Sequence, residues 1–294
     1  MKGLLAILLV GILAFANPAV PNNYTTSVKT GGEVEAKYIK TGSYEVKYFE
    51  EKTTENFKKY EVYYPKDLET TNTKYPVVVF VNGSGVKGSR YKALFRHLAS
   101  WGFIVLGNED ESSWAGASTD KTLTYIINKN KDKNSIFYNK IDTNNIGASG
   151  HSQGGAGIFN AITTNEHSSM YKTAVALSPA HEELSNGLKW TYDLTKVKIP
   201  ILMIAGTKGD FETQTVIPLE AMIKMYDKLN VQKVMMRKID IEHGQMLYEA
   251  DGYVTAWFMW RLKNDSYAGS AFKGQNAEIF NNNLYQDVKS NILN

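Results

Sequence analysis

The sequence contains no cysteine. This absence excludes disulfide bonds, thiolate metal sites and a lipid attached to a cysteine side chain. The protein must therefore be held together by its core. A chain of 294 residues that is 43% hydrophobic has enough apolar side chains to build a large one.

A strong net charge is also missing. The chain has 33 basic and 30 acidic residues, which give a net charge of +3, and the two signs are interspersed along it. A basic face for nucleic acid or for an anionic membrane is therefore not expected. The sequence also lacks repeats, low-complexity blocks and an obvious linker, so one large domain is favoured over a division into two.

The longest apolar run lies at the N-terminus, where Lys2 precedes the apolar residues 3–16. About fourteen residues are fewer than the roughly twenty that span a bilayer. Small residues at Ala14 and Ala16 form a typical cleavage site, and a second site ends at Ala19. Residues 1–16 are thus predicted to be the signal peptide of a secreted or periplasmic protein, with a membrane anchor as the less favoured alternative.

The rest of the chain divides into a polar lead-in (17–40), which is expected to be poorly ordered, and one domain (41–294). The tail 264–294 is polar overall, but apolar residues such as Phe272 and Ile279 favour its packing back onto the domain. A disordered extension is the alternative for this tail.

Hydrophobic periodicity predicts alternating strands and helices within the domain. Residues 77–81 are apolar throughout, which is typical of a strand buried on both faces of a parallel sheet. Before them, the alternating segments 44–49 and 57–64 predict an antiparallel pair. The pattern favours an α/β fold with a mostly parallel, doubly wound sheet flanked by helices. The later predicted strands are 103–106, 145–148, 173–177, 201–205 and 231–239, and the main helices are 90–101, 119–128, 219–229 and 249–262.

The most informative pattern is Gly150-His151-Ser152-Gln153-Gly154, a G-x-S-x-G sequence between a predicted strand and a predicted helix. A tight strand-to-helix turn presents the serine hydroxyl to a base and to backbone N–H donors, which together make it a nucleophile. Glycines around the serine allow neighbouring backbone to approach closely. The pattern therefore predicts that Ser152 is a catalytic nucleophile.

A nucleophile in this setting needs a carboxylate and a histidine later in the chain. Of the five histidines, only His243 follows a late strand and directly precedes the final helix. His97 comes before the serine, His151 is adjacent to it, His167 lies in a polar turn that is typical of the surface, and His181 comes too early to follow an acid. His243 is therefore the predicted general base, and a structural or surface histidine is the alternative.

The carboxylate is expected in the loop after strand 201–205. Asp210 is preferred there, to accept the imidazole N–H and to stabilise the imidazolium that forms during the reaction. Glu212 and Asp193 are the rival candidates. The alternative for Asp210 is that it only caps the helix that follows.

Two backbone N–H groups are needed to hold an oxyanion. One is predicted at Gln153, at a helix N-terminus, where the helix dipole also favours negative charge. The other is predicted at Ser84, in the glycine-rich loop after strand 77–81, with Gly83 and Gly85 as fallbacks. A plain glycine turn is the alternative for this loop.

In these features the chain resembles the secreted α/β-hydrolases around cutinases, bacterial polyester hydrolases, chlorophyllases and dienelactone hydrolases. The resemblance covers roughly residues 40–265. It is carried by the glycine loop at 82–84, the segment 98–105, the turn 150–155, the segment 206–210 and the loop around His243.

The resemblance implies an α/β-hydrolase fold in which Ser152, Asp210 and His243 form a catalytic triad and Ser84 and Gln153 hold the oxyanion. It further implies a serine esterase without cofactor or metal that cleaves small or polymeric carboxylic esters. Polyester hydrolases usually have an aromatic residue in place of Ser84, often a tryptophan after the strand that ends at 179–181, and a C-terminal disulfide. These departures favour general esters over aromatic polyesters.

Three further residues, Trp114, His181 and Trp190, fall in loops expected at the carboxyl edge of the sheet, where they could line a substrate pocket. Ordinary packing is the alternative for each. The segment 180–198 is too short for a helical lid, so an open cleft for medium or bulky esters is expected. A peptidase or acyltransferase on the same fold, or an exported binding protein without turnover, are the other functions that fit the sequence.

Overall fold

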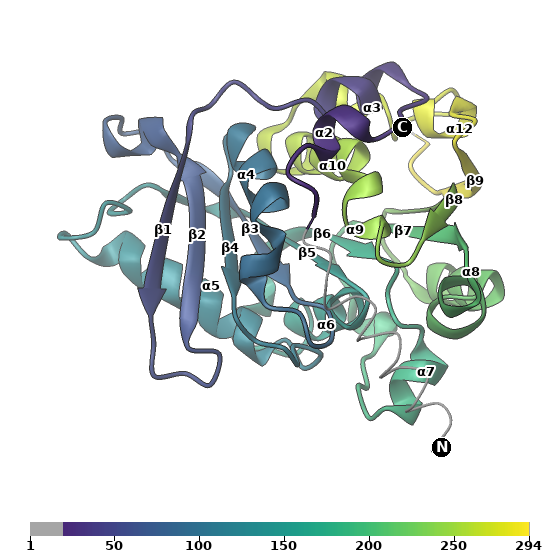
Figure 1. Ribbon diagram of the computed structural model, residues 1–294, viewed down its shortest axis with the longest axis horizontal. Coiled ribbons are helices and arrows are strands. Elements are labelled where there is room, and N and C mark those ends of the chain that lie inside the picture. The colour runs from purple at the N-terminus through teal and green to yellow at the C-terminus, as the bar shows by residue number, and fades with distance from the viewer. Residues whose placement is uncertain (1–19, 294) are drawn as a thin grey trace.

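The computed structural model describes residues 20–293. The predicted signal peptide (1–16) and its alternative end at residue 19 lie outside the described residues. The described part forms a nine-stranded sheet with helices on both faces, so the α/β prediction is confirmed (Figure 1). Within it, no helix has the length and apolar character needed to cross a membrane.

The sheet has the strand order β1-β2-β4-β3-β5-β6-β7-β8-β9. Its strands are β1 (Val46–Lys52), β2 (Lys59–Pro65), β3 (Tyr75–Val81), β4 (Ile104–Asn108), β5 (Ile141–His151), β6 (Tyr171–Leu177), β7 (Ile201–Lys208), β8 (Lys233–Glu242) and β9 (Tyr285–Ser290). Strands β4, β3, β5, β6, β7 and β8 pair in parallel. Antiparallel strands complete both edges, β1 and β2 at one edge and β9 at the other.

Each face of the sheet has its own hydrophobic core, because the strands carry apolar side chains on both sides. The longer helices are α4 (Lys92–Ser100), α5 (Ala117–Lys131), α6 (Gln153–Ala161), α8 (Leu219–Lys228) and α10 (Asp251–Lys263). Helices α4 and α10 pack on one face, and α5, α6 and α8 pack on the other. In α4, Leu94, Phe95 and Leu98 point into the core, whereas Lys92 and Arg96 are exposed.

Short helices and turns complete the chain. They are α2 (Tyr24–Ser27), α3 (Glu33–Tyr38), α7 (Glu182–Gly187), α9 (Met246–Glu249), α11 (Ser266–Gly269) and α12 (Glu278–Asn281), four 3-10 turns (Lys66–Glu69, Gly88–Tyr91, Ser168–Met170, Leu194–Lys196) and a π-helical turn (Phe211–Val216). Between β6 and β7 the chain forms only α7 and one 3-10 turn, which agrees with the expected absence of a large lid.

The lead-in is ordered where the structure describes it, so the expectation of poor order was wrong for residues 20–40. Its helices α2 and α3 lie against α10 and beside the C-terminal segment (Figure 1). The phenol groups of Tyr24 and Tyr38 are buried and donate hydrogen bonds to Asp251 and Asp265, at 2.5 and 2.6 Å. The polar average composition of this segment does not reveal such contacts, because a few aromatic side chains can bury a large area each.

The tail also packs on the domain rather than extending from it. Strand β9 pairs antiparallel with β8, and Phe272 and Ile279 are fully buried. The buried carboxylate of Glu35 joins the two ends of the described chain, because it accepts hydrogen bonds from Asn282 and Tyr285 at 2.7 Å each.

Candidate active site

Ser152 lies in a strained turn between β5 and α6. Its φ and ψ angles are 61° and −121°, a backbone conformation that residues with a side chain rarely adopt. Neighbouring backbone groups hold it there. The Ser152 N–H donates to the carbonyl of Leu177 at 3.0 Å, and the Ser152 carbonyl accepts from the N–H groups of Ala156 and Ala180 at 3.1 and 3.3 Å.

The glycines of the motif are required by close backbone contacts. A Cβ on Gly150 would lie 2.6 Å from the carbonyl oxygen of Gly154, and a Cβ on Gly154 would overlap the carbonyl oxygen of Val81. Any side chain at either position would therefore push the helix away from the sheet and distort the serine turn.

His243 lies in the loop after β8, and its imidazole is buried against a carboxylate. Its Nδ1 lies 2.5 Å from Oε2 of Glu212, and both side chains are almost completely buried. A carboxylate can only accept, so Nδ1 carries a proton, and whenever the ring is neutral Nε2 is its basic nitrogen. The ring of Phe211 packs edge-on against the imidazole, with 5.0 Å between the ring centroids.

The carboxylate beside His243 is Glu212 and not Asp210, which corrects the preference drawn from the sequence. Asp210 is exposed, and its carboxylate accepts a hydrogen bond from the side chain of Gln214 at 2.8 Å. The chain enters the π-helical turn directly after β7, and residues two apart in such a turn point to roughly opposite sides. When Glu212 faces the core, Asp210 must face the solvent. The other rival, Asp193, caps a 3-10 turn by accepting from Thr195.

Glu212 is held in its charged form by its surroundings. Burial alone would raise the pKa of this carboxyl, but the charge of His243 and the hydrogen bonds it receives hold the pKa below its usual value. Its Oε1 accepts the Ser178 hydroxyl and the Gly206 N–H, each at 2.6 Å. Its position and its ionisation are therefore both fixed before any substrate arrives.

His151, the residue before the serine, connects the serine turn to the histidine loop. Its Nε2 lies 2.7 Å from the backbone carbonyl of His243, and the two imidazole rings are 4.5 Å apart between centroids. Burial, together with the nearby charge of His243, lowers the pKa of His151 to about 3. The ring is thus neutral, and its Nε2–H donates to the carbonyl. Because His151 and Ser152 are consecutive, this contact brings the His243 loop to the serine turn.

The glycine loop after β3 leaves one backbone donor available for an oxyanion. The N–H of Gly83 donates to the Tyr91 hydroxyl at 3.1 Å, and the N–H of Gly85 donates to the carbonyl of Glu111 at 2.8 Å. Within residues 20–293, the N–H groups of Ser84 and Gln153 have no hydrogen-bond acceptor. Both fallback glycines are therefore engaged, and the pair expected from the sequence stays the best prediction.

Asn82 is buried and braces this loop. Its side-chain amide donates to the carbonyls of Asn108 and Asp110 at 2.8 and 2.7 Å, and its backbone carbonyl accepts a hydrogen bond from the hydroxyl of Ser113 at 2.5 Å. The loop that carries Ser84 is thus tied to the loop after β4.

The three residues expected to line a substrate pocket are half-buried and lie in three different loops. Trp190 packs on a small cluster that includes Ala156 and Ala180, the two residues whose N–H groups bind the Ser152 carbonyl. The carbonyl of Trp114 accepts from Asn160 of α6 at 3.0 Å. His181 directly precedes α7 and lines a surface cavity of about 530 Å³. A role in substrate binding stays a prediction for each of them.

Comparison with known families supports the fold. A family described as PETase, PET hydrolase-like, matches residues 25–263. The chain belongs to the PET hydrolase-like family. This membership confirms the resemblance to the polyester hydrolase group of α/β-hydrolases and supports hydrolysis of esters as the activity. No curated protein matches the chain significantly.

Sequence reasoning missed two residues of this PET hydrolase-like site, His151 and Ser178. His151 was set aside because it is adjacent to the serine, yet it contacts the histidine loop. Ser178 directly follows β6 and carries no motif. Polar residues at the carboxyl ends of neighbouring parallel strands are the one signal that could have indicated it.

Proposed function

We propose that this chain hydrolyses carboxylic esters through Ser152, His243 and Glu212, with an acyl-enzyme intermediate. The observation that carries the proposal is the short contact between His243 and Glu212 at the sheet edge where the strained Ser152 turn lies. It supplies a base whose tautomer and orientation are fixed, and the contact of His151 with the His243 carbonyl brings the loop of this base to the serine turn.

In the proposed reaction, Nε2 of His243 takes the proton of the Ser152 hydroxyl while Oγ attacks the ester carbonyl. The tetrahedral oxyanion accepts hydrogen bonds from the N–H groups of Gln153 and Ser84. His243 then gives the proton to the departing alcohol, which leaves an acyl-serine. A water molecule, deprotonated by the same imidazole, attacks this acyl group and releases the acid. As the bond between the acyl group and Oγ breaks, His243 gives this proton to Ser152, so the free enzyme is restored and the cycle needs no cofactor.

We propose that the enzyme is exported and that its substrates are medium-sized or bulky esters. The short connection between β6 and β7 supports an open cleft. Ser84 stands where polyester hydrolases usually have an aromatic ring, so general esters are favoured over aromatic polyesters. The predicted signal peptide supports a secreted or periplasmic location.

The test uses the purified mature protein and p-nitrophenyl esters of graded acyl length. We expect turnover that extends beyond the acetyl ester, a stoichiometric label from a fluorophosphonate, and loss of both in Ser152→Ala. Ser112→Ala, an exposed serine in the loop after β4, is the matched control and should behave as the unaltered protein. Retained turnover in Ser152→Ala would refute the mechanism, and turnover confined to acetyl esters would refute the open cleft.

Hydrolysis is separated from acyl transfer by product analysis. With an added alcohol acceptor, a hydrolase releases mainly the free acid, whereas an acyltransferase forms mainly the new ester. A predominance of the transfer product would replace the hydrolase assignment but keep the same nucleophile.

A further inference from the structure

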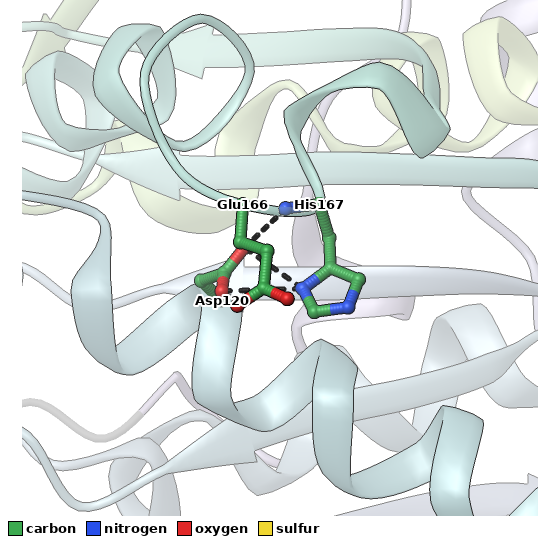
Figure 2. Close-up of side chains that lie close together, drawn as sticks. All are labelled: Asp120, Glu166 and His167. Atoms are coloured by element: carbon green, nitrogen blue, oxygen red, sulfur yellow. Dashed lines mark hydrogen bonds and ion pairs between the residues drawn. The ribbon is translucent and has the colours of Figure 1, made fainter.

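A second cluster of chemically active side chains lies away from the serine turn, between α5 and the turn that follows α6. It contains Asp120, Glu166 and His167, and one ligand atom of each lies within 4.8 Å of the other two. Figure 2 shows the carboxylates of Asp120 and Glu166 beside Nδ1 of His167. None of these residues takes part in the proposed reaction.

The spacing of the first two ligand atoms suits a shared metal ion. Nδ1 of His167 lies 3.3 and 3.2 Å from the two carboxylate oxygens of Asp120. Two ligands of a tetrahedral zinc ion with bonds of about 2.0–2.1 Å are separated by about 3.3 Å. The ion would replace the proton that Nδ1 now shares with the carboxylate.

Backbone contacts hold these ligands in place. The N–H of His167 donates to Oδ1 of Asp120 at 2.9 Å, which orients the carboxylate toward the imidazole. The side chain of Asn165 donates to the carbonyls of Ala115 and Asn160, each at 3.2 Å, so the turn is fixed to its neighbours. Such supporting hydrogen bonds are typical of the surroundings of metal ligands.

An unpartnered buried hydroxyl nearby points independently to a missing ligand. The Tyr171 side chain is almost completely buried, and its hydroxyl has no hydrogen-bond partner within the described residues. Tyr171 begins β6, four residues after His167, and the negative charge of Asp120 is, after burial, the other cause that raises the pKa of this phenol. A buried polar group without a partner is commonly explained by a water molecule or an ion that completes its surroundings.

We propose that Asp120, Glu166 and His167 bind a divalent transition-metal ion, of which Zn²⁺ is the best fit. One imidazole with two carboxylates suits zinc or its neighbours better than calcium, which prefers oxygen ligands alone. Asp120 and Glu166 also line a cavity of about 820 Å³, which gives an ion access from solvent. Three protein ligands leave the fourth position for water, and the ion would clamp α5 to the turn after α6.

The test is calorimetric titration of the chelator-treated protein with Zn²⁺, repeated with Co²⁺ to record its absorption spectrum. Because the active-site imidazole can also bind metals, the protein is first labelled at the serine with a fluorophosphonate, or carries His243→Ala if it does not label. We expect one equivalent of Zn²⁺ to bind, and a cobalt spectrum of tetrahedral intensity.

Glu166→Gln is the decisive variant, because Glu166 is exposed and makes no hydrogen bond within the described residues. This variant should fold normally and bind Zn²⁺ at least about tenfold more weakly. Replacing a residue that only hydrogen-bonds to a metal ligand already lowers metal affinity about 10–100-fold. His167→Ala should bind more weakly still. Asp132→Asn, which alters another carboxylate of the same cavity, is the matched control and should bind as the unaltered protein.

Absence of stoichiometric binding would overturn the proposal. Equal affinity in Glu166→Gln and the unaltered protein would do so as well, as would an equal loss in Asp132→Asn. None of these results depends on ester hydrolysis, so the metal site and the proposed reaction fail or succeed separately.

Discussion

Replacing Glu212 by glutamine gives the sharpest test of the active site, because it removes one charge and almost no volume. Three donors converge on this carboxylate: the His243 imidazole at 2.5 Å, and the Ser178 hydroxyl and Gly206 N–H at 2.6 Å each. A carboxamide has a single oxygen. If that oxygen keeps the two donors at 2.6 Å, its NH₂ group faces Nδ1 and forces the imidazole into the wrong tautomer.

The expected loss follows from this conflict. Nδ1 would have to accept from the amide, so the proton would move to Nε2 and the base would be blocked, and the imidazolium would lose its buried counter-charge. The corresponding aspartate-to-asparagine change in serine proteases lowers kcat about 10⁴-fold. We expect a fall of about 10³- to 10⁴-fold for Glu212→Gln, or about 4 to 5.5 kcal/mol in the activation free energy.

The assay is steady-state hydrolysis of a p-nitrophenyl ester, with urea unfolding to verify that the variant is folded. Asp210→Asn is the matched control, since it removes a carboxylate two residues away that faces solvent, and its kcat should stay within about twofold. If Asp210→Asn were the damaging change and Glu212→Gln the mild one, the assignment of the carboxylate from the geometry would be refuted.

Three further predictions follow from buried contacts. His151→Phe keeps the ring but removes the donor to the His243 carbonyl, so kcat for ester hydrolysis should fall about tenfold, the cost of roughly one net hydrogen bond; an unchanged kcat would show that this bond does not position the loop. Gly154→Ala should destabilise the protein by about 1–3 kcal/mol in urea unfolding, because its Cβ overlaps the Val81 carbonyl; unaltered stability would contradict the tight turn. Burial lowers the pKa of His97, but the charge of Asp251 at 2.6 Å outweighs it and the net shift is upward. The contribution of this pair to stability is therefore complete below about pH 6.5 and is lost as the pH rises through the higher folded pKa. Asp251→Asn should lower the free energy of unfolding by about 3–5 kcal/mol at low pH, and this free energy should depend less on pH than in the unaltered protein. Parallel profiles of the unfolding free energy against pH in both proteins would count against the ion pair.

Local patterns were enough to predict the order of strands and helices. The strand at 77–81 and the helix at 90–101 could be predicted without knowledge of distant segments. Burial on both faces of a strand, or along one stripe of a helix, produces a recognisable pattern in consecutive residues. The proposed nucleophile could also be predicted from a short segment, since a strand, a tight turn and a helix determine its geometry within a few residues. His243 followed from chain order alone.

The choice of carboxylate was decided by the tertiary structure. Asp210 and Glu212 both follow the same strand, and the sequence does not show which side of the turn after it faces the core. This orientation of the turn is called its phase below. The phase is set by what packs against that turn, where Ser178 and Gly206 supply donors on the inner side. A carboxylate on that side is stabilised without water, whereas Asp210 on the outer side keeps its hydration.

The same reason explains the lead-in and His151. Composition marked residues 17–40 as polar, but the hydroxyls of Tyr24 and Tyr38 find carboxylate partners more than two hundred residues away. The sequence by itself was enough to predict the main strands and helices of the domain and to propose the serine and the histidine of the site. Only the folded chain decided which polar groups meet across it, because a hydrogen bond depends on positions that distant segments acquire together.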